Sequence, residues 1–278
     1  MTTTDRQIPV VLLHNGCHEY MQTAITQACK MNNVILIGDT DPKIDIDGFE
    51  FFDIKNYWEE CEVFAKSYIH LNTTSVPYET FCFQRWMVLR NFMRKENIDL
   101  VFHIDSDVLL FVDVNEEWNK YEQYDMTLVH RSAGTSIFTK LGILEDYCSF
   151  FINTYKNTGG YIFKKVASHY QARQETGQAG GVCDMTFFDL FQHHSNEGGG
   201  PFRVGEMTQI INDSTYDHHI NANDPGYEFK DGLKVFSTVN KIPYIKNKRL
   251  NKNIKFNCLH FLGDAKSIMT KAYEEHFK

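Results

Sequence analysis

Leu100-Val-Phe-His-Ile-Asp105-Ser-Asp107-Val-Leu-Leu-Phe111 is the stretch that decides the fold, because it places two carboxylates inside a long apolar run. Burying a carboxylate is costly unless another group neutralises it. If this stretch is a strand or the frayed end of one, Asp105 and Asp107 point to the same face and can reach one hard divalent cation. Such a cation often also holds a phosphate, so the pattern indicates a site for a metal-bound diphosphate. The simpler alternative is that one aspartate caps a turn and the other is solvated.

The residues before this stretch alternate between apolar runs and helical patterns. Apolar runs at 8–13, 34–39 and 49–52 are typical of strands. Apolar residues at helical spacing extend over about 19–31 and 80–96, and the second segment leads directly into the aspartate stretch. This alternation, with strands that are apolar throughout, predicts an α/β fold with a Rossmann-like, mostly parallel central sheet flanked by helices.

The second half of the chain has a less regular pattern. The expected elements, in chain order, are a strand at 126–129, a turn at 132–134 into another strand, a helix at about 144–155, a polar irregular stretch at 169–183, a helix at 185–193, a loop at 196–201, lysine-rich hairpins from about 226 and a final helix from about 265. No repeat or long linker divides the chain. Residues 1–278 are therefore predicted to be a single domain with halves at about 1–112 and 113–278.

The composition excludes several classes of protein. The chain has 278 residues, 42% of them hydrophobic, and a formal net charge of −8, which argues against broad nucleic-acid affinity because binding phosphate backbones requires a basic surface. Its seven cysteines are scattered and include no Cys-x-x-Cys pair, so neither a disulfide framework nor a thiolate zinc site is expected. The first residues show no signal peptide and no apolar run reaches about eighteen residues, so we expect no membrane span and a cytoplasmic protein.

Two glycine-containing motifs follow the aspartates. In Gly180-Gly-Val-Cys-Asp184, a glycine pair precedes an acid at an expected helix start, where the helix dipole stabilises a carboxylate. Asp184 as a functional acid and Asp184 as an N-cap are compatible interpretations. In Ser132-Ala-Gly134, small residues allow a close approach of the backbone to a ligand, although an ordinary turn is the simpler interpretation.

Histidines occur in three places in the second half. The pairs His193-His194 and His218-His219 lack the spacing of a helical zinc site, so we predict surface positions for them. The third place is His260-Phe-Leu-Gly-Asp-Ala-Lys266. Here a histidine ends an apolar run and can complete the shell of a cation, Gly263 allows approach to a phosphate, and the lysine can neutralise it. Together with the aspartates, this segment forms a predicted metal–diphosphate constellation.

The order of these motifs resembles that of nucleotide-sugar-dependent glycosyltransferases with the GT-A architecture. Ile104-Asp-Ser-Asp-Val-Leu-Leu matches the Asp-x-Asp strand of that superfamily. Residues 260–266 are similar to the His-Phe-x-Gly-x-x-Lys segment of glycogenin-like and lipopolysaccharide galactosyltransferase-like retaining enzymes. The resemblance implies a GT-A fold with a nucleotide-sugar-binding first half and an acceptor-binding second half. It also implies these roles: Mn²⁺ (or Mg²⁺) ligation by Asp105, Asp107 and His260, and diphosphate contacts from Gly263 and Lys266.

The chain departs from those families at three positions. Ser132 stands where they have the asparagine of an Asn-x-Gly segment, Met185 follows Asp184 where they have glutamine, and Ser267-Ile268 replaces a Pro-Trp pair. The superfamily resemblance is therefore closer than the resemblance to any one family.

The remaining site predictions concern the donor and the acceptor. Ligands bind beyond the carboxyl ends of strands in open α/β sheets, which nominates His14, Asn15 and Asp39 for the base and ribose. Either Arg85 or Arg90, about one helical turn apart, can face the diphosphate. The further nominations are Gly134 for a close approach to the donor and Asp184 as the general base of an inverting enzyme, or as the residue that orients the donor in a retaining one. A basic stretch is interpreted mainly as a solvated hairpin, with a flexible arm over the diphosphate or a dock for an anionic surface as alternatives: Lys241, Lys246, Lys248, Arg249, Lys252 and Lys255.

The sequence thus predicts a metal-dependent glycosyltransferase that moves a sugar from a nucleotide-sugar donor to a glycan or other hydroxyl acceptor. The expected donor is a UDP-sugar. Two other classes stay open: a metal-dependent nucleotidyltransferase, which would be expected to have a Gly-rich basic loop near the first strand, and a non-catalytic sugar-binding protein. The sequence does not specify the donor sugar, the acceptor, the anomeric outcome or the oligomeric state.

Overall fold

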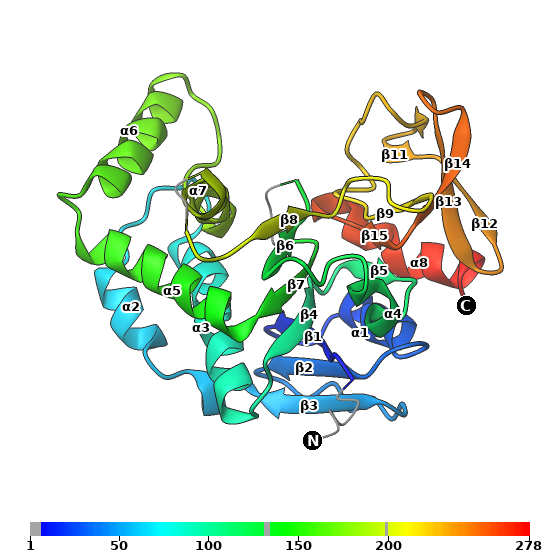
Figure 1. Ribbon diagram of the computed structural model, residues 1–278, viewed down its shortest axis with the longest axis horizontal. Coiled ribbons are helices and arrows are strands. Elements are labelled where there is room, and N and C mark those ends of the chain that lie inside the picture. Colours follow the sequence, from blue (N-terminus) through cyan, green and yellow to red (C-terminus); the bar gives the residue numbers. More distant parts are fainter. Residues whose placement is uncertain (1–6, 131–133, 198–199) are drawn as a thin grey trace.

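The computed structural model describes residues 7–130, 134–197 and 200–278 (Figure 1). A seven-stranded sheet with the order β3-β2-β1-β4-β7-β6-β8 forms its centre. Its strands are β1 (Val10–His14), β2 (Val34–Gly38), β3 (Phe49–Asp53), β4 (Leu100–Ile104), β6 (Met126–Leu128), β7 (Ser136–Lys140) and β8 (Val204–Glu206). Only β7 runs antiparallel to its neighbours in this sheet. The predicted α/β class with a mostly parallel central sheet flanked by helices is confirmed.

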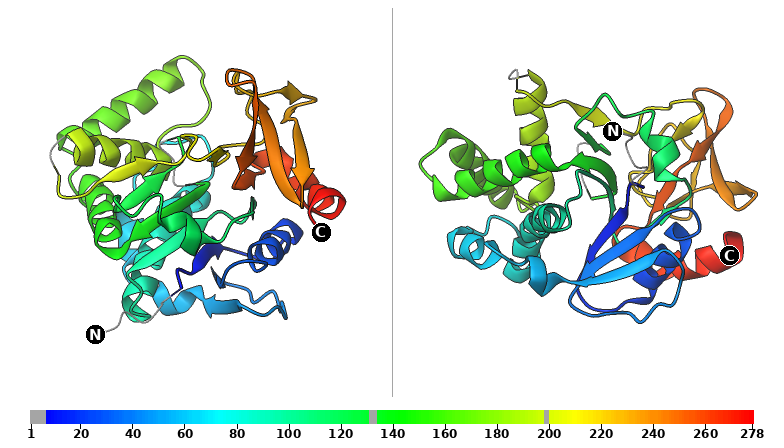
Figure 2. Two further views of the ribbon diagram at one scale, coloured as in Figure 1. Left: turned by 45° about the vertical axis from the view of Figure 1, so that its right-hand side comes forward. Right: turned by 60° about the horizontal axis from the view of Figure 1, so that its bottom comes forward.

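Helices cover both faces of this sheet, which explains why its strands are apolar throughout. Along β1, Val10 and Leu12 belong to the buried cluster that includes α1 and α8, whereas Val11 and Leu13 belong to the cluster that includes α3 and α5. Figures 1 and 2 show these two pairs of helices on opposite sides of the sheet. The helices are α1 (Glu19–Ala28), α2 (Cys61–Ser67), α3 (Val76–Lys95), α4 (Val114–Trp118), α5 (Leu141–Lys156), α6 (Tyr161–Glu175), α7 (Asp184–Glu197) and α8 (Lys266–His276), with 3-10 turns η1 (Ile54–Tyr57) and η2 (Gly263–Ala265).

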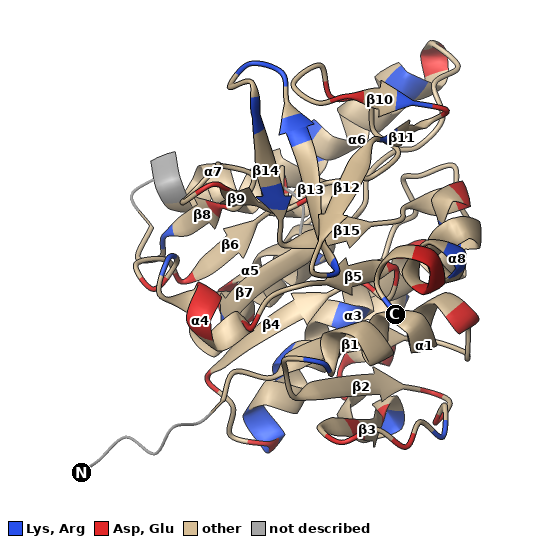
Figure 3. Ribbon diagram, turned by 90° about the vertical axis from the view of Figure 1, so that its right-hand side faces the viewer, with Lys and Arg blue, Asp and Glu red and all other residues tan. Residues whose placement is uncertain are grey.

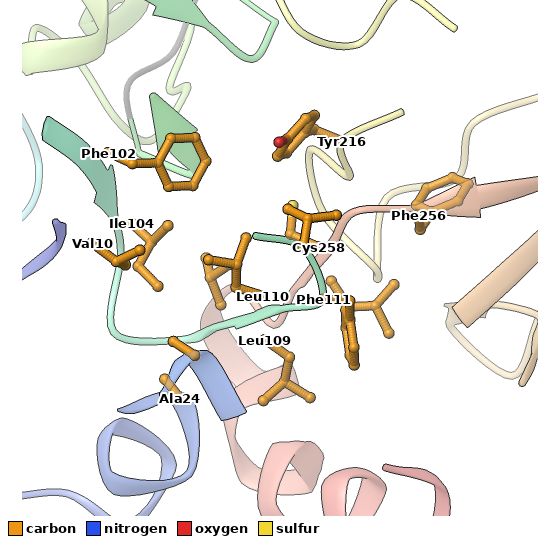
Figure 4. Packing of buried hydrophobic residues seen from close by; sticks show 14 of the residues in the cluster. Val10, Ala24, Phe102, Ile104, Leu109, Leu110, Phe111, Tyr216, Phe256 and Cys258 are labelled. Atoms are coloured by element: carbon orange, nitrogen blue, oxygen red, sulfur yellow. The ribbon is translucent and has the colours of Figure 1, made fainter. Parts of the chain in front are cut away.

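Small sheets build the C-terminal part. The antiparallel strands β12 (Phe236–Val239), β13 (Ile242–Asn247) and β14 (Lys252–Phe256) continue onto β9 (Ser214–Thr215), and β10 (Phe229–Lys230) pairs with β11 (Leu233–Lys234). The last strand, β15 (Cys258–His260), pairs with β5 (Val108–Leu110), which follows the aspartates directly. Figure 4 shows Leu110 of β5 and Cys258 of β15 in one buried cluster with Phe102. The core therefore extends from the first half of the chain into its last strand.

The prediction of an irregular stretch at 169–183 is wrong for its first part, because α6 continues to Glu175. Phe163, Val166, Ala167 and Tyr170 of this helix are at helical spacing and pack against the core, so the sequence pattern is present but is hidden among the polar residues around it. The predicted helices at 144–155 and 185–193 are present and begin a few residues earlier, as α5 and α7. Within the described part of the chain, no helix is both long and apolar enough to cross a membrane.

Phe138 of β7 gives a test of this core. Its ring centroid lies 4.5 Å from that of Phe102, 5.0 Å from that of Trp118 and 5.8 Å from that of Tyr121. We expect Phe138→Ala to lower the free energy of unfolding by about 3–5 kcal/mol, since it removes buried area and leaves a cavity. Urea unfolding followed by circular dichroism measures this loss. Val239→Ala, at an exposed position of β12, is the control, and an equally small change in both variants would contradict the described packing.

Candidate active site

The two aspartates lie in the turn between β4 and β5 rather than within a strand. The turn is closed by the backbone N–H of Val108, which donates to the carbonyl oxygen of Asp105 at 3.2 Å. The side chain of Asp107 is 4% exposed and that of Asp105 is 22% exposed. The frayed strand end predicted from the sequence therefore brings both carboxylates to the carboxyl edge of the sheet, one of them buried and one facing a cleft.

The last strand and the helix after it bring two basic groups to Asp107. His260 is paired with Val108 in the β15–β5 ladder, and its Nε2 lies 3.3 Å from Asp107 Oδ1. Lys266 at the start of α8 places its Nζ 3.1 Å from Asp107 Oδ2. Burial lowers the pKa of His260 and of Lys266, but the Asp107 carboxylate outweighs this and raises both pKa values above their usual ranges. Residues far apart in sequence thus form one charged cluster.

The cluster has the donor atoms of a metal site. One ligand atom from each of Asp105, Asp107 and His260 lies within 4.8 Å of the others, a spacing that one cation can bridge. His260 Nδ1 lies 2.7 Å from the carbonyl oxygen of His218, which can only accept, so this network assigns the proton to Nδ1. In the neutral ring, Nε2 carries the lone pair and faces Asp107 Oδ1 at 3.3 Å, and a cation would take the place of the proton that the carboxylate otherwise favours there. Two carboxylates and an imidazole lone pair fit a divalent cation.

Arg85 of α3 connects this cluster to Asp184. Its Nη1 donates to Asp105 Oδ1 and its Nη2 to Asp184 Oδ2, both at 2.7 Å. Burial raises the pKa of Asp105, but Arg85 outweighs it and holds that pKa at about 2. Of the two arginines considered from the sequence, only Arg85 is at the site, since Arg90 pairs with Glu60 at 2.6 Å.

Asp184 is buried at the first residue of α7, where the sequence places it. Its Oδ2 also accepts from Trp86 Nε1 at 2.9 Å, and its Oδ1 accepts from the N–H of Met185 at 2.9 Å. Including Arg85, three donors therefore hold this carboxylate in one orientation. A carboxylate so held fixes the position of Arg85 with respect to Asp105.

A cleft of about 470 Å³ opens above the cluster. The predicted residues that line it are His14, Asn15, Arg85, Asp105, Asp107 and Lys266. Asp39 is exposed beside the cleft, where its Oδ1 accepts from the N–H of Gly16 at 2.6 Å and shapes the loop after β1. His14 lies 2.9 Å from Ser106 Oγ, and burial, with the charges of His18 and Lys266, lowers its pKa to about 4.

The two glycines nominated from the sequence flank the cluster. Gly134 is buried next to Thr135, whose Oγ1 lies 3.1 Å from His260 Nδ1. Gly263 has a φ of +61°, and a Cβ there would contact no atom within 4 Å, so backbone conformation rather than space favours glycine. Ser132 and Ala133 lie outside the described residues.

Several residues of the site escaped the sequence prediction. Tyr20, Tyr78 and Phe81 line the cleft, and no pattern other than general aromatic richness indicates them. The surface prediction is correct for the exposed His193 and His194. It is wrong for His218-His219, which are half-buried and stacked, with ring centroids 3.7 Å apart. His218 serves the site through its backbone carbonyl, which ligand-spacing rules for ring nitrogens do not consider.

Comparison with known proteins finds glycosyltransferases among the similar solved structures. No family model and no curated protein sequence matches the chain. Similar solved structures include mouse xyloside xylosyltransferase 1 (9% identity, 75% of this chain and 87% of that one, TM-score 0.46) and the galactosyltransferase LgtC (11%, 75% and 76%, TM-score 0.39). A third is the bifunctional glycosyltransferase WbbM (12%, TM-score 0.46), where 95% of this chain matches 47% of the other. Since all three TM-scores are below 0.5, we base the function on the geometry of the site.

Arg85 provides a test of the charge network. We expect Arg85→Met to lower the free energy of unfolding by about 3–5 kcal/mol at pH 7, because it leaves buried carboxylates uncompensated. Arg85 lowers the folded-state pKa of Asp105 to about 2, so its stabilisation is complete above the unfolded pKa of about 3.9 and is lost as the pH falls toward 2. The difference between wild type and variant should therefore shrink below about pH 4 in urea-unfolding curves.

The control is Arg94→Met, which breaks a surface pair with Glu145 whose side chains are 47% and 37% exposed. We expect it to cost less than about 1 kcal/mol. A cost of Arg85→Met as small as that of the control would contradict the bridging role.

Proposed function

We propose that this chain is a metal-dependent glycosyltransferase that uses a nucleotide-sugar donor. One observation carries the proposal: Asp105, Asp107 and Lys266 line the same cleft at the carboxyl edge of the sheet. His260 lies behind the two aspartates and places its Nε2 within reach of the same cation. A diphosphate is the ligand for which a cation held by two carboxylates and an imidazole, with a lysine beside it, is chemically suited. Mixed carboxylate and imidazole ligands favour Mn²⁺, with Mg²⁺ as the alternative.

The leaving group determines what the site must do. In transfer, the bond between the anomeric carbon and the diphosphate oxygen breaks, a bond to the acceptor oxygen forms, and the proton of the acceptor hydroxyl passes to the departing diphosphate or to solvent. A bound divalent cation would stabilise the charge that develops on the departing nucleoside diphosphate. Lys266 adds a cation at the same place, and its 36% exposed side chain faces the cleft. Arg85, bridged between Asp105 and Asp184, keeps the cleft wall fixed while this happens.

The donor has room beside the cluster. We propose that the base and ribose lie along the loop after β1, against His14 and Asn15, with Asp39 fixing the loop from behind. Tyr78, which is 60% exposed, lines the cleft and offers a face for stacking, whereas the ring of Tyr20 already stacks on His18 and lies under Lys266. We propose that Gly134, next to Thr135, and Gly263, three residues before Lys266, allow a close approach of the backbone to the diphosphate. A UDP-sugar is the donor to test first, with a glycan hydroxyl as the acceptor.

His260 provides a direct test of the metal site. With Mn²⁺ and a panel of UDP-sugars, the wild-type protein should slowly hydrolyse one donor and release nucleoside diphosphate, and a chelator should abolish this. We expect His260→Ala to weaken Mn²⁺ binding at least 10-fold by isothermal titration calorimetry, because it removes one of three ligands. His276→Ala, an exposed histidine on α8, is the control. Pyrophosphate release from a nucleoside triphosphate would instead favour a nucleotidyltransferase, and binding without turnover a sugar-binding protein.

Asp184 remains our candidate for the catalytic residue, and its three hydrogen bonds favour a role in orienting Arg85 and the donor. We expect Asp184→Asn to reduce transfer at least 100-fold, while the Kd for the nucleoside diphosphate changes less than about threefold. Asp189→Asn, on the same helix, is the matched control. Unchanged turnover in Asp184→Asn would remove this residue from the site.

A further inference from the structure

A second cavity, of about 310 Å³, lies within the C-terminal part of the molecule. Its volume is within the range of roughly 300–1,000 Å³ that ligand sites occupy. Segments from four places in the chain wall it, and the residues used below are Tyr216, His218, Tyr227, Lys234 and Arg249. Among the described residues, none lines both this cavity and the cleft above Asp105 and Asp107.

The cavity wall and the metal ligand form one hydrogen-bonded unit. His218 lines the cavity, while its carbonyl oxygen lies 2.7 Å from Nδ1 of His260. Asp217, also in the wall, accepts at Oδ2 from the backbone N–H of His260 at 3.1 Å. A ligand in this cavity would therefore contact the segment that positions the metal ligand.

The lining has the chemistry of a saccharide site. Tyr216, Tyr227 and Phe256 are buried aromatic residues of the wall and give the cavity an apolar lining, which suits a sugar ring better than a fully polar wall would. Asp217 and Lys234 neutralise each other in a buried pair at 2.6 Å. Arg249 differs from them: it is exposed, and its guanidinium has no hydrogen bond or ion pair with any described residue. The lining also holds the carboxylate of Asp224, whose Oδ1 accepts from the N–H of Gly226 at 2.8 Å, so a ligand anion would have to turn to Arg249 and away from Asp224.

The surrounding charge favours a negatively charged ligand. Residues 226–256 contain eight lysines and arginines but only two acidic residues, whereas the rest of the chain has twenty basic and thirty-four acidic residues. Figure 3 shows basic residues gathered on β13, β14 and the turn between them. A positive region in an otherwise acidic protein concentrates anions at this cavity.

We propose that this cavity is the acceptor subsite and that it takes a saccharide bearing a carboxylate or a phosphate, held by Arg249. The role of the ligand as an acceptor rests on the proposed glycosyltransferase function. The binding of the ligand rests on the cavity alone. A guanidinium binds either anion through two parallel hydrogen bonds, and the aromatic and polar wall holds the ring.

Ligand-observed NMR, without metal ion or nucleotide sugar, tests the binding. The probes are glucuronate, glucose 6-phosphate, glucose and inorganic phosphate. We expect at least one of the two anionic sugars to bind 10-fold or more tightly than glucose or inorganic phosphate, and the stronger of the two identifies the carboxylate or the phosphate as the recognised group. Arg249→Ala should abolish this preference, and Lys248→Ala, the exposed neighbour that does not line the cavity, should retain it.

A second variant tests the location. Ile210→Trp fills the cavity from its half-buried wall and should weaken binding of the anionic sugar at least 10-fold, with the fold verified by circular dichroism. The proposal would be overturned if glucose or inorganic phosphate bound as tightly as the anionic sugars. It would also be overturned if Arg249→Ala did not change the binding of the anionic sugar. The NMR assay contains no nucleotide sugar, so its result does not depend on donor hydrolysis. A failure of donor hydrolysis would contradict the proposed function and would leave the binding result unchanged.

Discussion

The neutralisation of buried carboxylates is the constraint on which the rest of the structure depends. Asp105, Asp107 and Asp184 converge at one edge of the sheet, where Arg85 pairs with both Asp105 and Asp184 and Lys266 pairs with Asp107. Arg85 comes from α3 and Lys266 from α8, so the two helical layers are linked through the charges between them. Removing water from a carboxylate is costly, and these pairings make that burial tolerable. The ends of the chain and its middle must therefore come together for the fold to form.

The pairing of β5 with β15 gives this convergence its precision. Three successive residue pairs, ending with His260 opposite Val108, fix the height of the histidine relative to Asp107. A shift by one residue would turn His260 to the other face of the strand, since side chains alternate. Leu109, Leu110 and Cys258 are buried in the core cluster, so hydrophobic packing prevents such a shift. The position of a polar site is thus determined by apolar neighbours.

The sequence predicted those parts of the molecule in which one segment carries its own signal. Strands covered on both faces are apolar runs, and the Asp-x-Asp and His-x-x-Gly-x-x-Lys segments combine chemistry with spacing. Helix α6 was missed although Phe163, Val166, Ala167 and Tyr170 form a narrow apolar stripe, because the residues between and after them are polar. The roles of Trp86 and of the His218 carbonyl were missed because both depend on pairings between distant segments. No local pattern encodes which backbone oxygen a histidine ring will meet. The single-domain organisation and the roles of individual site residues stay predictions.

The cations of the cluster divide into fixed and exchangeable groups. Arg85 is 13% exposed and bridges two carboxylates through two nitrogens, so moving it would leave both of them unpaired. Lys266 is 36% exposed, faces the cleft and has a single carboxylate partner, so it can turn to an arriving phosphate at little cost. A divalent cation between Asp105 and Asp107 would compensate for the charge that Lys266 then withdraws from Asp107. The ion pairs that stabilise the fold thus leave Lys266 able to turn to a diphosphate, while Arg85 keeps Asp105 and Asp184 in place.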